Sequence, residues 1–152
     1  MSFQILGAGS FVPEKIVTND ELSRMVETSD EWIVKRIGVK QRHVCTTETV
    51  TDLGVEASKR ALEDAGVKAE ELDLIIAATI SADTISPGLA GMVQNRLGAH
   101  CPAFDMNVAC PGFLFALDVA AGFFARKTVK KVLVVSAERM SGLLDWGDRG
   151  TC

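Results

Sequence analysis

Apolar and polar positions follow one another along this chain in two rhythms, and each predicts one kind of element. Nearly continuous apolar runs are typical of strands buried on both faces, as in a parallel sheet covered by helices. Apolar residues three and four positions apart, with charged residues between, predict helices that pack by one face. Strands are predicted over 3–9, 72–79, 104–109 and 131–137, and helices over 49–65, 86–97 and 112–125. This alternation predicts an α/β fold with right-handed crossovers.

Some of these segments carry further local signals. The helix over 112–125 is apolar almost all round, so we expect it to be largely buried. Gly7 and Gly9 read as turn residues, because a dinucleotide-binding loop would need a third glycine where Val12 stands. Thr-Asn-Asp-Glu at 18–21 is a capping-box pattern, which predicts a short helix to about residue 26.

A further short helix carries a tryptophan and an arginine. Ser29 or Asp30 caps it, and Gly38 ends it. Trp32 and Arg36 lie four positions apart and so share one helical face. On spacing alone, a half-buried Trp beside a surface Arg is the plainer interpretation.

The polar segment 37–49 reads as a loop or an extended hairpin. His43 and Cys45 would face the same side of a strand there. A catalytic Cys–His pair is one interpretation; we favour surface roles, because two like-facing neighbours on one strand rarely make a site. His100 reads as a structural or surface residue.

Cys110 stands where a strand gives way to a helix. Pro111 suits the first helical position, where its missing N–H is not needed. A thiol at a helix start lies near free backbone N–H groups and the positive end of the helix dipole, which favour the nucleophilic thiolate. Free cysteines are also often small core residues. Position alone leaves both interpretations open.

Composition narrows the class of protein. The 152 residues suit one domain with a real core, and the net charge of −4 argues against a nucleic-acid partner. Two histidines and no C-x-x-C pair argue against a zinc site.

The longest apolar run is shorter than the roughly 20 residues of a membrane span. We see no secretory leader, so we expect a cytoplasmic location, with the cysteines reduced. The cysteines are Cys45, Cys101, Cys110 and Cys152.

Three stretches in a fixed order resemble one family. Ala103–Phe113 resembles the active-site segment of thiolase-like condensing enzymes, and the match is to β-ketoacyl-[acyl carrier protein] synthase III. Thr28–Gly38 and Asp145–Thr151 resemble two further stretches of the same family. The resemblance implies a thiolase-like α/β fold with a mixed, mostly parallel sheet and helices on both faces. Residues 1–152 would be its amino-terminal half-domain, and the carboxyl-terminal half is absent from this chain.

The resemblance also implies a chemistry. Cys110 would take an acyl group from acyl-CoA, and malonyl-[acyl carrier protein] would then condense with it, which starts a fatty acid. The catalytic His and Asn would come from the missing half, so we expect this fragment alone to be inactive. No metal or redox cofactor is implied; the coenzyme A thioester is a substrate. The family forms homodimers.

Coenzyme A contacts follow from the same resemblance. Trp32 and Arg149 would lie on the two sides of the adenine, and Thr28 and Arg36 would lie near the nucleotide, with Arg36 at a phosphate. A guanidinium and an indole both suit stacking.

Two positions depart from the family pattern. Ser86 stands where many members carry an aromatic residue that closes the acyl pocket, so a longer or branched acyl primer could fit. Pro111 replaces a small residue such as Ala or Ser and removes one backbone donor near the thiol.

Other functions remain as alternatives. A related condensing enzyme is one: a polyketide or quinolone starter synthase, a hydroxymethylglutaryl-CoA synthase or a thiolase. A non-catalytic module that binds acyl-CoA or a carrier protein is another.

Overall fold

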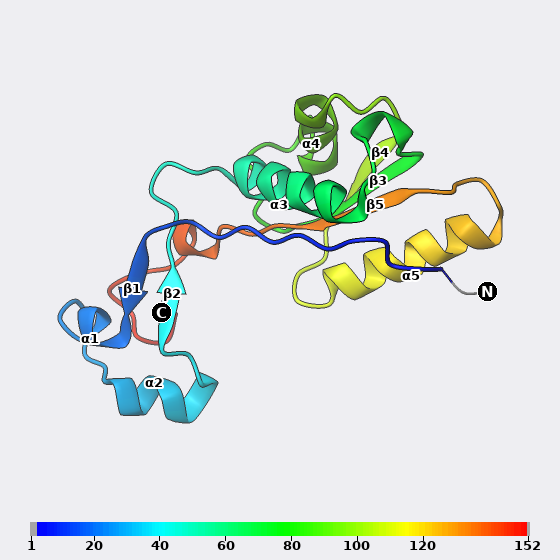
Figure 1. The fold of residues 1–152 in the computed structure, drawn as a ribbon. Coiled ribbons are helices and arrows are strands. Elements are labelled where there is room, and N and C mark those ends of the chain that lie inside the picture. Colours follow the sequence, from blue (N-terminus) through cyan, green and yellow to red (C-terminus); the bar gives the residue numbers. More distant parts are fainter. Residues whose placement is uncertain (1–2, 152) are drawn as a thin grey trace. The chain divides into compact units, whose positions relative to one another are not determined.

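The computed structural model describes residues 3–151, so Cys152 lies outside the described residues (Figure 1). The chain forms two compact units, and each contains two separate stretches of sequence. The first unit comprises Met1–Phe11 and Thr49–Glu138; the second comprises Val12–Glu48 and Arg139–Cys152. Each unit is described by itself below.

A parallel sheet forms the centre of the first unit. Its strands are β3 (Leu74–Ala78), β4 (Ala103–Met106) and β5 (Val132–Ser136), in the order β4-β3-β5. Ile76 on β3 pairs with Phe104 on one side and Val134 on the other. Every residue of β3 is buried, as the uninterrupted apolar run predicts. The predicted parallel sheet is confirmed, with shorter strands.

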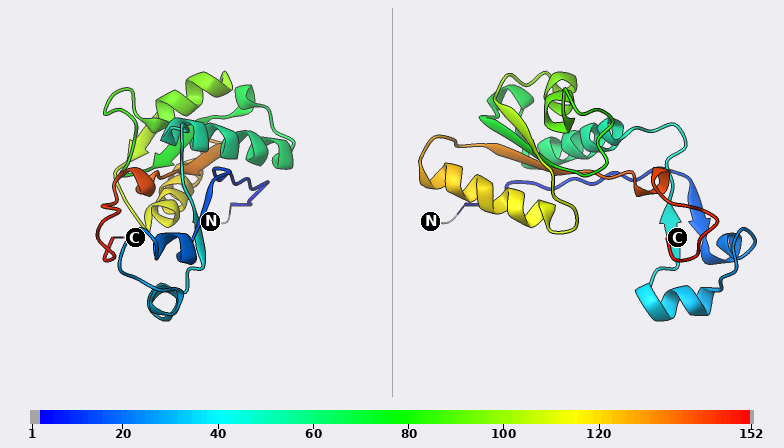
Figure 2. Two further views of the ribbon diagram at one scale, coloured as in Figure 1. Left: turned by 90° about the vertical axis from the view of Figure 1, so that its left-hand side faces the viewer. Right: turned by 180° about the vertical axis from the view of Figure 1, so that it is seen from behind.

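Helices cover both faces of this sheet (Figures 1 and 2). α3 (Val50–Ala65) and α4 (Leu89–Leu97) lie on one face, and α5 (Gly112–Ala125) lies on the other. Gly66 and Gly98 end α3 and α4 with positive φ angles. α4 begins three residues later than predicted, after the cis peptide bond Ser86–Pro87. A single 3-10 turn, η1 (Ala69–Glu71), precedes β3.

α5 is less buried than its composition predicts. Only Gly112, Ala116 and Ala120 are buried, on the face that meets the sheet. Three apolar side chains near its start are exposed: the exposed fraction is 47% for Phe113, 67% for Leu114 and 52% for Phe115. The prediction of a largely buried helix is therefore wrong for this chain, because the sheet covers only one face of α5.

The predicted strand over 3–9 is also wrong, since these residues are extended without strand pairing. They lie against α3 instead: a Cβ on Gly7 would be 2.5 Å from the Ala65 nitrogen, and one on Gly9 would be 2.3 Å from the Ala61 nitrogen. Neither glycine has a positive φ. The two glycines thus serve close approach to a helix and not a turn.

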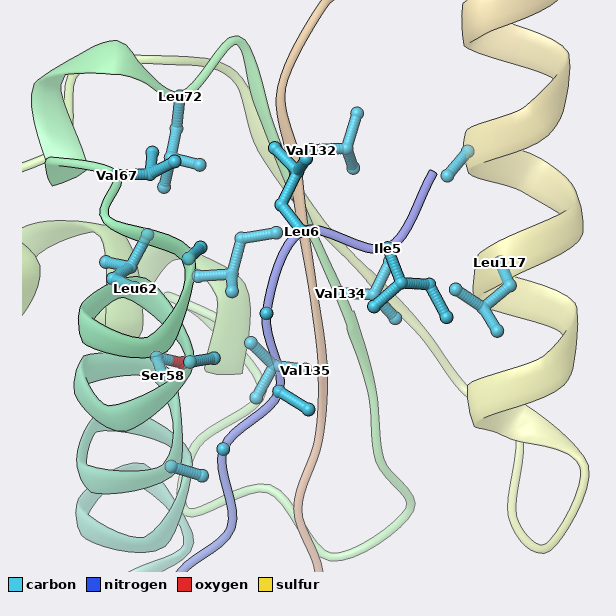
Figure 3. Close-up of a pocket in the computed structure, with 18 of the residues that line it drawn as sticks. Ile5, Leu6, Ser58, Leu62, Val67, Leu72, Leu117, Val132, Val134 and Val135 are labelled. Atoms are coloured by element: carbon cyan, nitrogen blue, oxygen red, sulfur yellow. The ribbon is translucent and has the colours of Figure 1, made fainter. Parts of the chain in front are cut away.

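An apolar cavity of about 410 Å³ lies between this segment and β5 (Figure 3). β5 is the last strand in the sheet order, so the cavity occupies the side of β5 opposite β3. Among its lining residues are Ile5, Leu6, Leu117, Val132 and Val134.

The second unit contains a small antiparallel pair. β1 (Ile16–Thr18) pairs with β2 (Gln41–His43), and the helices are α1 (Asn19–Leu22) and α2 (Asp30–Ile37). A 3-10 turn, η2 (Met140–Gly142), lies in its second stretch. The predicted capping box at Thr18 is confirmed, but α1 ends about four residues early, because the backbone closes into tighter turns after Leu22.

Among residues 3–151, no helix has the length and apolar character needed to cross a membrane. The same residues contain no group of three or more His, Cys, Asp or Glu side chains placed to hold a metal ion.

Candidate active site

Cys110 is an exposed thiol between β4 and α5. The structure begins the helix at Gly112, as the predicted range has it, and places Pro111 at the N-cap and not at the first helical position. The helix start is intact: the Gly112 N–H donates to the Ala109 carbonyl at 2.8 Å, and the Phe115 N–H donates to the Pro111 carbonyl at 3.0 Å. Within the described residues Cys110 is exposed, which favours the interpretation as a nucleophile over that as a core cysteine.

Cys101 provides the contrast. It is buried, and burial raises the pKa of its thiol. A thiol held protonated in the core is unreactive. Of these two cysteines, Cys110 is therefore the better candidate for a nucleophile.

The carboxyl ends of all three parallel strands lie around the turn that contains Cys110. β4 leads directly into that turn, and the Thr79 N–H after β3 donates to the Met106 carbonyl at the end of β4 (3.2 Å). Glu138, two residues after β5, binds the residues that follow β3. This is the edge where open α/β sheets usually bind ligands.

Trp32 forms a second candidate site, in the second unit. The Ser29 hydroxyl accepts a hydrogen bond from the Trp32 N–H at 3.1 Å and so begins α2 as predicted. One turn later, the Arg36 guanidinium lies 3.9 Å from the centre of the indole ring. Its Nη1 also donates to the Trp32 carbonyl at 3.4 Å.

Arg149 approaches the same indole from a distant part of the sequence. Its guanidinium carbon lies 5.2 Å from the ring centre, and Nη1 donates to the Glu27 carbonyl at 3.4 Å. Turns built on two aspartates shape this loop: Asp145 accepts from the Gly147 N–H, and Asp148 accepts from the Gly150 N–H. The structure thus brings together Trp32, Arg36 and Arg149.

Thr28 lies in the same region and has an unusual hydroxyl. Its Oγ1 is buried and has no hydrogen-bond partner among the described residues. A buried hydroxyl without a partner is costly, and a bound ligand can satisfy it. A binding role for Thr28, which the family resemblance implies, is compatible with this hydroxyl.

The other sequence candidates have plainer roles. The Pro13 carbonyl accepts a hydrogen bond from the His43 Nδ1 at 2.6 Å, so His43 holds the chain near β1. Cys45 lies beyond the end of β2, and His100 is exposed. Ser86 is exposed in the loop before α4, in the first unit with Cys110.

Three carboxylates with lowered pKa values make local structural contacts. The Arg96 side chain, followed by the Thr49 N–H and hydroxyl, lowers the pKa of Asp52 to about 2. The Lys130 and Lys131 N–H groups lower the pKa of Asp73, and the Thr18 N–H and hydroxyl lower that of Glu21. None of these three carboxylates belongs to either candidate site.

Sequence reasoning missed two acidic residues at or just beyond the carboxyl ends of β4 and β5. Asp105 accepts from the Leu89 and Ala90 N–H groups at the start of α4, both at 2.6 Å. Glu138 accepts from the Ile80 N–H and the Thr79 hydroxyl. Asp105 lies in the carboxyl half of the observed β4. Glu138 directly follows the strand predicted over 131–137, and that position was the available signal for it.

Comparison with known proteins identifies the family. The model of 3-oxoacyl-[acyl-carrier-protein] synthase III matches residues 104–152. The β-ketoacyl-[acyl-carrier-protein] synthase III of Clostridium acetobutylicum is 51% identical over 152 residues, which cover 99% of this chain and 47% of that protein. The synthase III of Ehrlichia canis is 50% identical over 150 residues, with 97% and 47% covered.

Comparison with solved structures gives the same family. The synthase III of Aquifex aeolicus VF5 superposes with a TM-score of 0.96 at 44% identity, covering 98% of this chain and 49% of that chain. The priming β-ketosynthase of the R1128 polyketide pathway gives 0.92 at 38% identity, with 96% and 44% covered. The predicted thiolase-like fold is confirmed. This chain spans about half the length of the relatives it matches and, over that length, belongs to the β-ketoacyl-[acyl carrier protein] synthase III family.

Proposed function

We propose that this chain carries the nucleophile of an acyltransferase that starts fatty-acid biosynthesis by condensing an acyl-CoA with malonyl-[acyl carrier protein]. About half of its residues are identical to those of proteins named β-ketoacyl-[acyl-carrier-protein] synthase III. The observation that carries the proposal is the exposed thiol of Cys110, between the end of a central parallel strand and the start of a helix.

The first step is acyl transfer to Cys110. The thiolate attacks the thioester carbonyl of acetyl-CoA or another short acyl-CoA, and a tetrahedral oxyanion forms. Backbone N–H groups, one of them from Cys110, stabilise that oxyanion. The intermediate then expels coenzyme A as a thiol and leaves an acyl-Cys110 thioester.

The second step forms the carbon–carbon bond. Malonyl-[acyl carrier protein] loses CO2, and the resulting carbanion attacks the acyl-Cys110 carbonyl. The Cys110 thiolate leaves, and the product is a β-ketoacyl-[acyl carrier protein]. The His and Asn that stabilise the carbanion belong to the remaining half of the protein, so activity requires that half. No metal or redox cofactor takes part.

In this proposal coenzyme A is bound by four residues of the second unit: Trp32, Arg149, Arg36 and Thr28. A planar base stacked between two partners needs about 3.5–4.0 Å on each side, or about 7–8 Å in all. Arg149 lies 5.2 Å from the Trp32 ring, so it moves outward when adenine enters between them. The two guanidinium groups supply charge for the nucleotide phosphates, and the Thr28 hydroxyl gains a partner.

Ser86 sets the size of the acyl primer. It presents a small side chain where many family members have an aromatic one, so the pocket admits longer or branched acyl groups. A chain-length series of acyl-CoA primers tests this. Activity confined to acetyl-CoA in wild type, unchanged in Ser86→Phe, would contradict it.

The partners follow from the same chemistry. They are acyl-CoA, malonyl-[acyl carrier protein], the remaining half of the protein and a second copy in a homodimer. The proposed location is the cytoplasm, where these substrates of lipid metabolism are made.

The decisive experiment is an intact-mass measurement with peptide mapping after incubation with acetyl-CoA. It uses full-length protein, or this chain joined to the remaining half of the Clostridium acetobutylicum relative. We expect one acetyl group on Cys110, none in Cys110→Ser and an unchanged adduct in Cys101→Ser. Loss of the adduct in Cys101→Ser but not in Cys110→Ser would refute the assignment.

A second candidate is a priming synthase of polyketide biosynthesis, which the similarity to the R1128 enzyme supports. Both candidates share the acyl-Cys110 step and differ in the carrier protein that accepts the acyl group. Competition between fatty-acid and polyketide carrier proteins separates them. A protein that binds acyl-CoA and a carrier protein but forms no acyl-Cys110 would instead be a non-catalytic binding module.

A further inference from the structure

Glu138 makes a concentrated set of hydrogen bonds at the carboxyl end of the sheet. Its Oε1 accepts from the Ile80 N–H at 2.8 Å, and its Oε2 accepts from the Thr79 hydroxyl at 3.2 Å. The Ser81 hydroxyl donates to the same Oε2. All three donors come from the segment that immediately follows β3, so one carboxylate fixes the path of that segment.

The same end of β3 supports both sides of the turn that contains Cys110. Before the cysteine, the Met106 carbonyl accepts from the Thr79 N–H at 3.2 Å and from the Val108 N–H at 3.0 Å. After it, Gly112 lies so close to β3 that an added Cβ would be 2.9 Å from the Ala78 Cβ. Thr79 is only 5% exposed, so this contact is tightly packed.

We propose that Glu138 is a positioning residue for the Cys110 nucleophile and acts through Thr79. The carboxylate holds Thr79–Ser81, and the end of β3 in turn holds the backbone on each side of the cysteine. Nucleophilic attack requires the sulfur and the carbonyl carbon at about 3–3.5 Å, and a 1 Å misplacement can cost about 100-fold in rate. The inference rests on the proposed function and adds a residue to its machinery.

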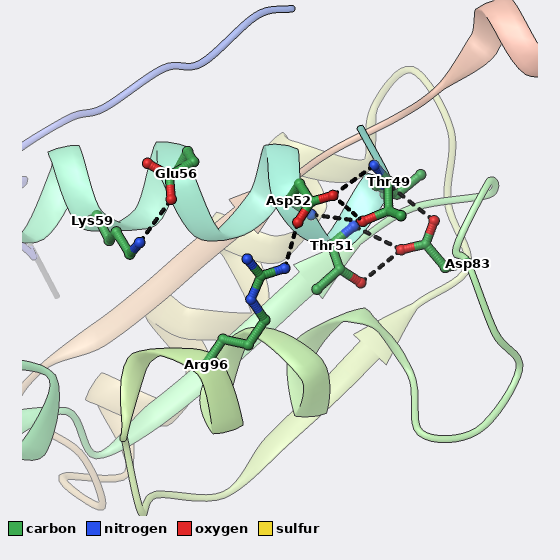
Figure 4. A network of polar contacts seen from close by, with 8 residues as sticks. Thr49, Thr51, Asp52, Glu56, Lys59, Asp83 and Arg96 are labelled. Atoms are coloured by element: carbon green, nitrogen blue, oxygen red, sulfur yellow. Dashed lines mark hydrogen bonds and ion pairs between the residues drawn. The ribbon is translucent and has the colours of Figure 1, made fainter. Parts of the chain in front are cut away.

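The far end of the segment is anchored independently of Glu138. The Asp83 carboxylate accepts from the Val50 N–H at 2.9 Å, the Thr51 N–H at 2.8 Å and the Thr51 hydroxyl at 2.7 Å, at the start of α3 (Figure 4). Loss of Glu138 therefore frees one end of the segment while the other stays attached to the fold. For this reason we expect Glu138 variants to remain folded.

Glu138→Gln is the sharpest variant because it keeps the size of the side chain. A glutamate presents two acceptor oxygens to its donors, whereas glutamine presents one oxygen and an NH2 group that can only donate. The variant cannot accept all three bonds in the observed arrangement. Asp73→Asn is the matched control: Asp73 accepts from the Lys130 and Lys131 N–H groups at 2.7 and 2.9 Å, just before β3 and β5 begin.

The experiment measures three quantities in full-length wild type and both variants. They are the single-turnover rate of Cys110 acetylation with its acetyl-CoA dependence, the rate of Cys110 alkylation by iodoacetamide, and Tm. We expect Glu138→Gln to slow acetylation about ten-fold or more, with the half-saturating acetyl-CoA concentration changed less than three-fold. We expect Asp73→Asn to lower Tm comparably and leave acetylation unchanged.

Other results would overturn the inference. If Glu138→Gln acetylates at the wild-type rate, or if Asp73→Asn is slowed as much, Glu138 has only a structural role. If wild type acquires no acetyl group, the proposed function fails; a change of alkylation rate confined to Glu138→Gln then still supports positioning, and its absence refutes it. Should Glu138→Gln fail to fold, Ser81→Ala decides: we expect slower acetylation, and a wild-type rate overturns the inference.

Discussion

Gly88 shows how one missing side chain lets a strand fix the start of a helix. The Asp105 carboxylate on β4 reaches the first N–H groups of α4, where it replaces the side-chain cap that Gly88 cannot provide. A Cβ on Gly88 would lie 2.3 Å from Asp105 Oδ2. The carboxylate and any side chain at position 88 therefore exclude each other.

We expect Gly88→Ala to lower the free energy of unfolding by about 1–3 kcal/mol, because the carboxylate must leave its place or the helix must shift. Urea denaturation measures this. Gly91→Ala in the same helix is the control, since its Cβ would meet its nearest neighbour, the Pro87 Cβ, at an ordinary 3.7 Å. Equal destabilisation by both changes would contradict the argument.

Asp52 predicts a pH dependence of stability. Arg96 Nη1 lies 2.6 Å from Asp52 Oδ1, and the Thr49 N–H and hydroxyl bind Oδ2 (Figure 4). These contacts lower the pKa of Asp52 from 3.8 to about 2. Because the folded-state pKa is the lower one, the stabilisation is complete above the unfolded value and is lost as pH falls from about 5 to about 2.

We expect Asp52→Asn to cost about 1 kcal/mol at pH 7 and to unfold with a smaller pH dependence between pH 5 and 2. Urea denaturation at a series of pH values measures both. Glu56→Gln serves as the control, because the exposed Glu56–Lys59 pair contributes little. Parallel pH profiles for wild type and Asp52→Asn would refute the expectation.

At the scale of elements, the segment over 3–9 depends on contact with α3 and not on strand pairing. A Cβ on Gly9 would lie 2.3 Å from the Ala61 nitrogen and 2.4 Å from the Ala57 carbonyl oxygen. Both atoms are helix backbone, which cannot give way as a flexible side chain would.

We therefore expect Gly9→Ala to detach residues 3–11 from α3. Amide hydrogen exchange should rise in that segment, most clearly at the Ala8 N–H, which donates to Asp64 Oδ2 at 2.9 Å. Ala8→Ser, at an exposed neighbouring position, should exchange as wild type does. Unchanged protection in Gly9→Ala would show that the segment tolerates a side chain there.

Hydrophobic periodicity was a good guide to elements that complete their packing within this chain. The predicted bounds of α5 match the structure, and α3 begins after Thr49 and ends before Gly66 as expected. The same patterns gave two wrong predictions: a strand over residues 3–9 and a largely buried α5. Periodicity reports which surfaces are apolar, but it does not report whether this chain supplies what would cover them.

Some residues of the candidate sites could be predicted from local sequence signals, and others could not. Local signals predict Cys110 at a strand–helix junction and Trp32 beside Arg36. No spacing rule brings Arg149 to Trp32, so that contact was reached only through the family resemblance. Glu138 was missed because its partners lie 57 to 59 residues away in sequence.

At the scale of the whole molecule, the residues proposed to bind coenzyme A and the proposed nucleophile, Cys110, lie in different units of the chain. We expect Trp32→Ala in the full-length protein to raise the half-saturating acetyl-CoA concentration about ten-fold, through loss of base stacking worth about 1–3 kcal/mol. Iodoacetamide lacks a nucleotide, so its rate with Cys110 should not change. Equal losses in both reactions would mean that the substitution disturbs Cys110 itself.

The second unit is assembled from two stretches, with nearly all of the first unit between them. Arg149 follows Glu27, whose carbonyl it contacts, by 122 positions. A ribosome adding about 5–20 residues per second needs roughly 6–24 seconds to cover that interval. During this time α2 and its indole are already made, but Arg149 is not. The cluster of Trp32, Arg36 and Arg149, which we propose binds coenzyme A, is therefore completed late in synthesis, after the strand and helix that hold Cys110 have been made.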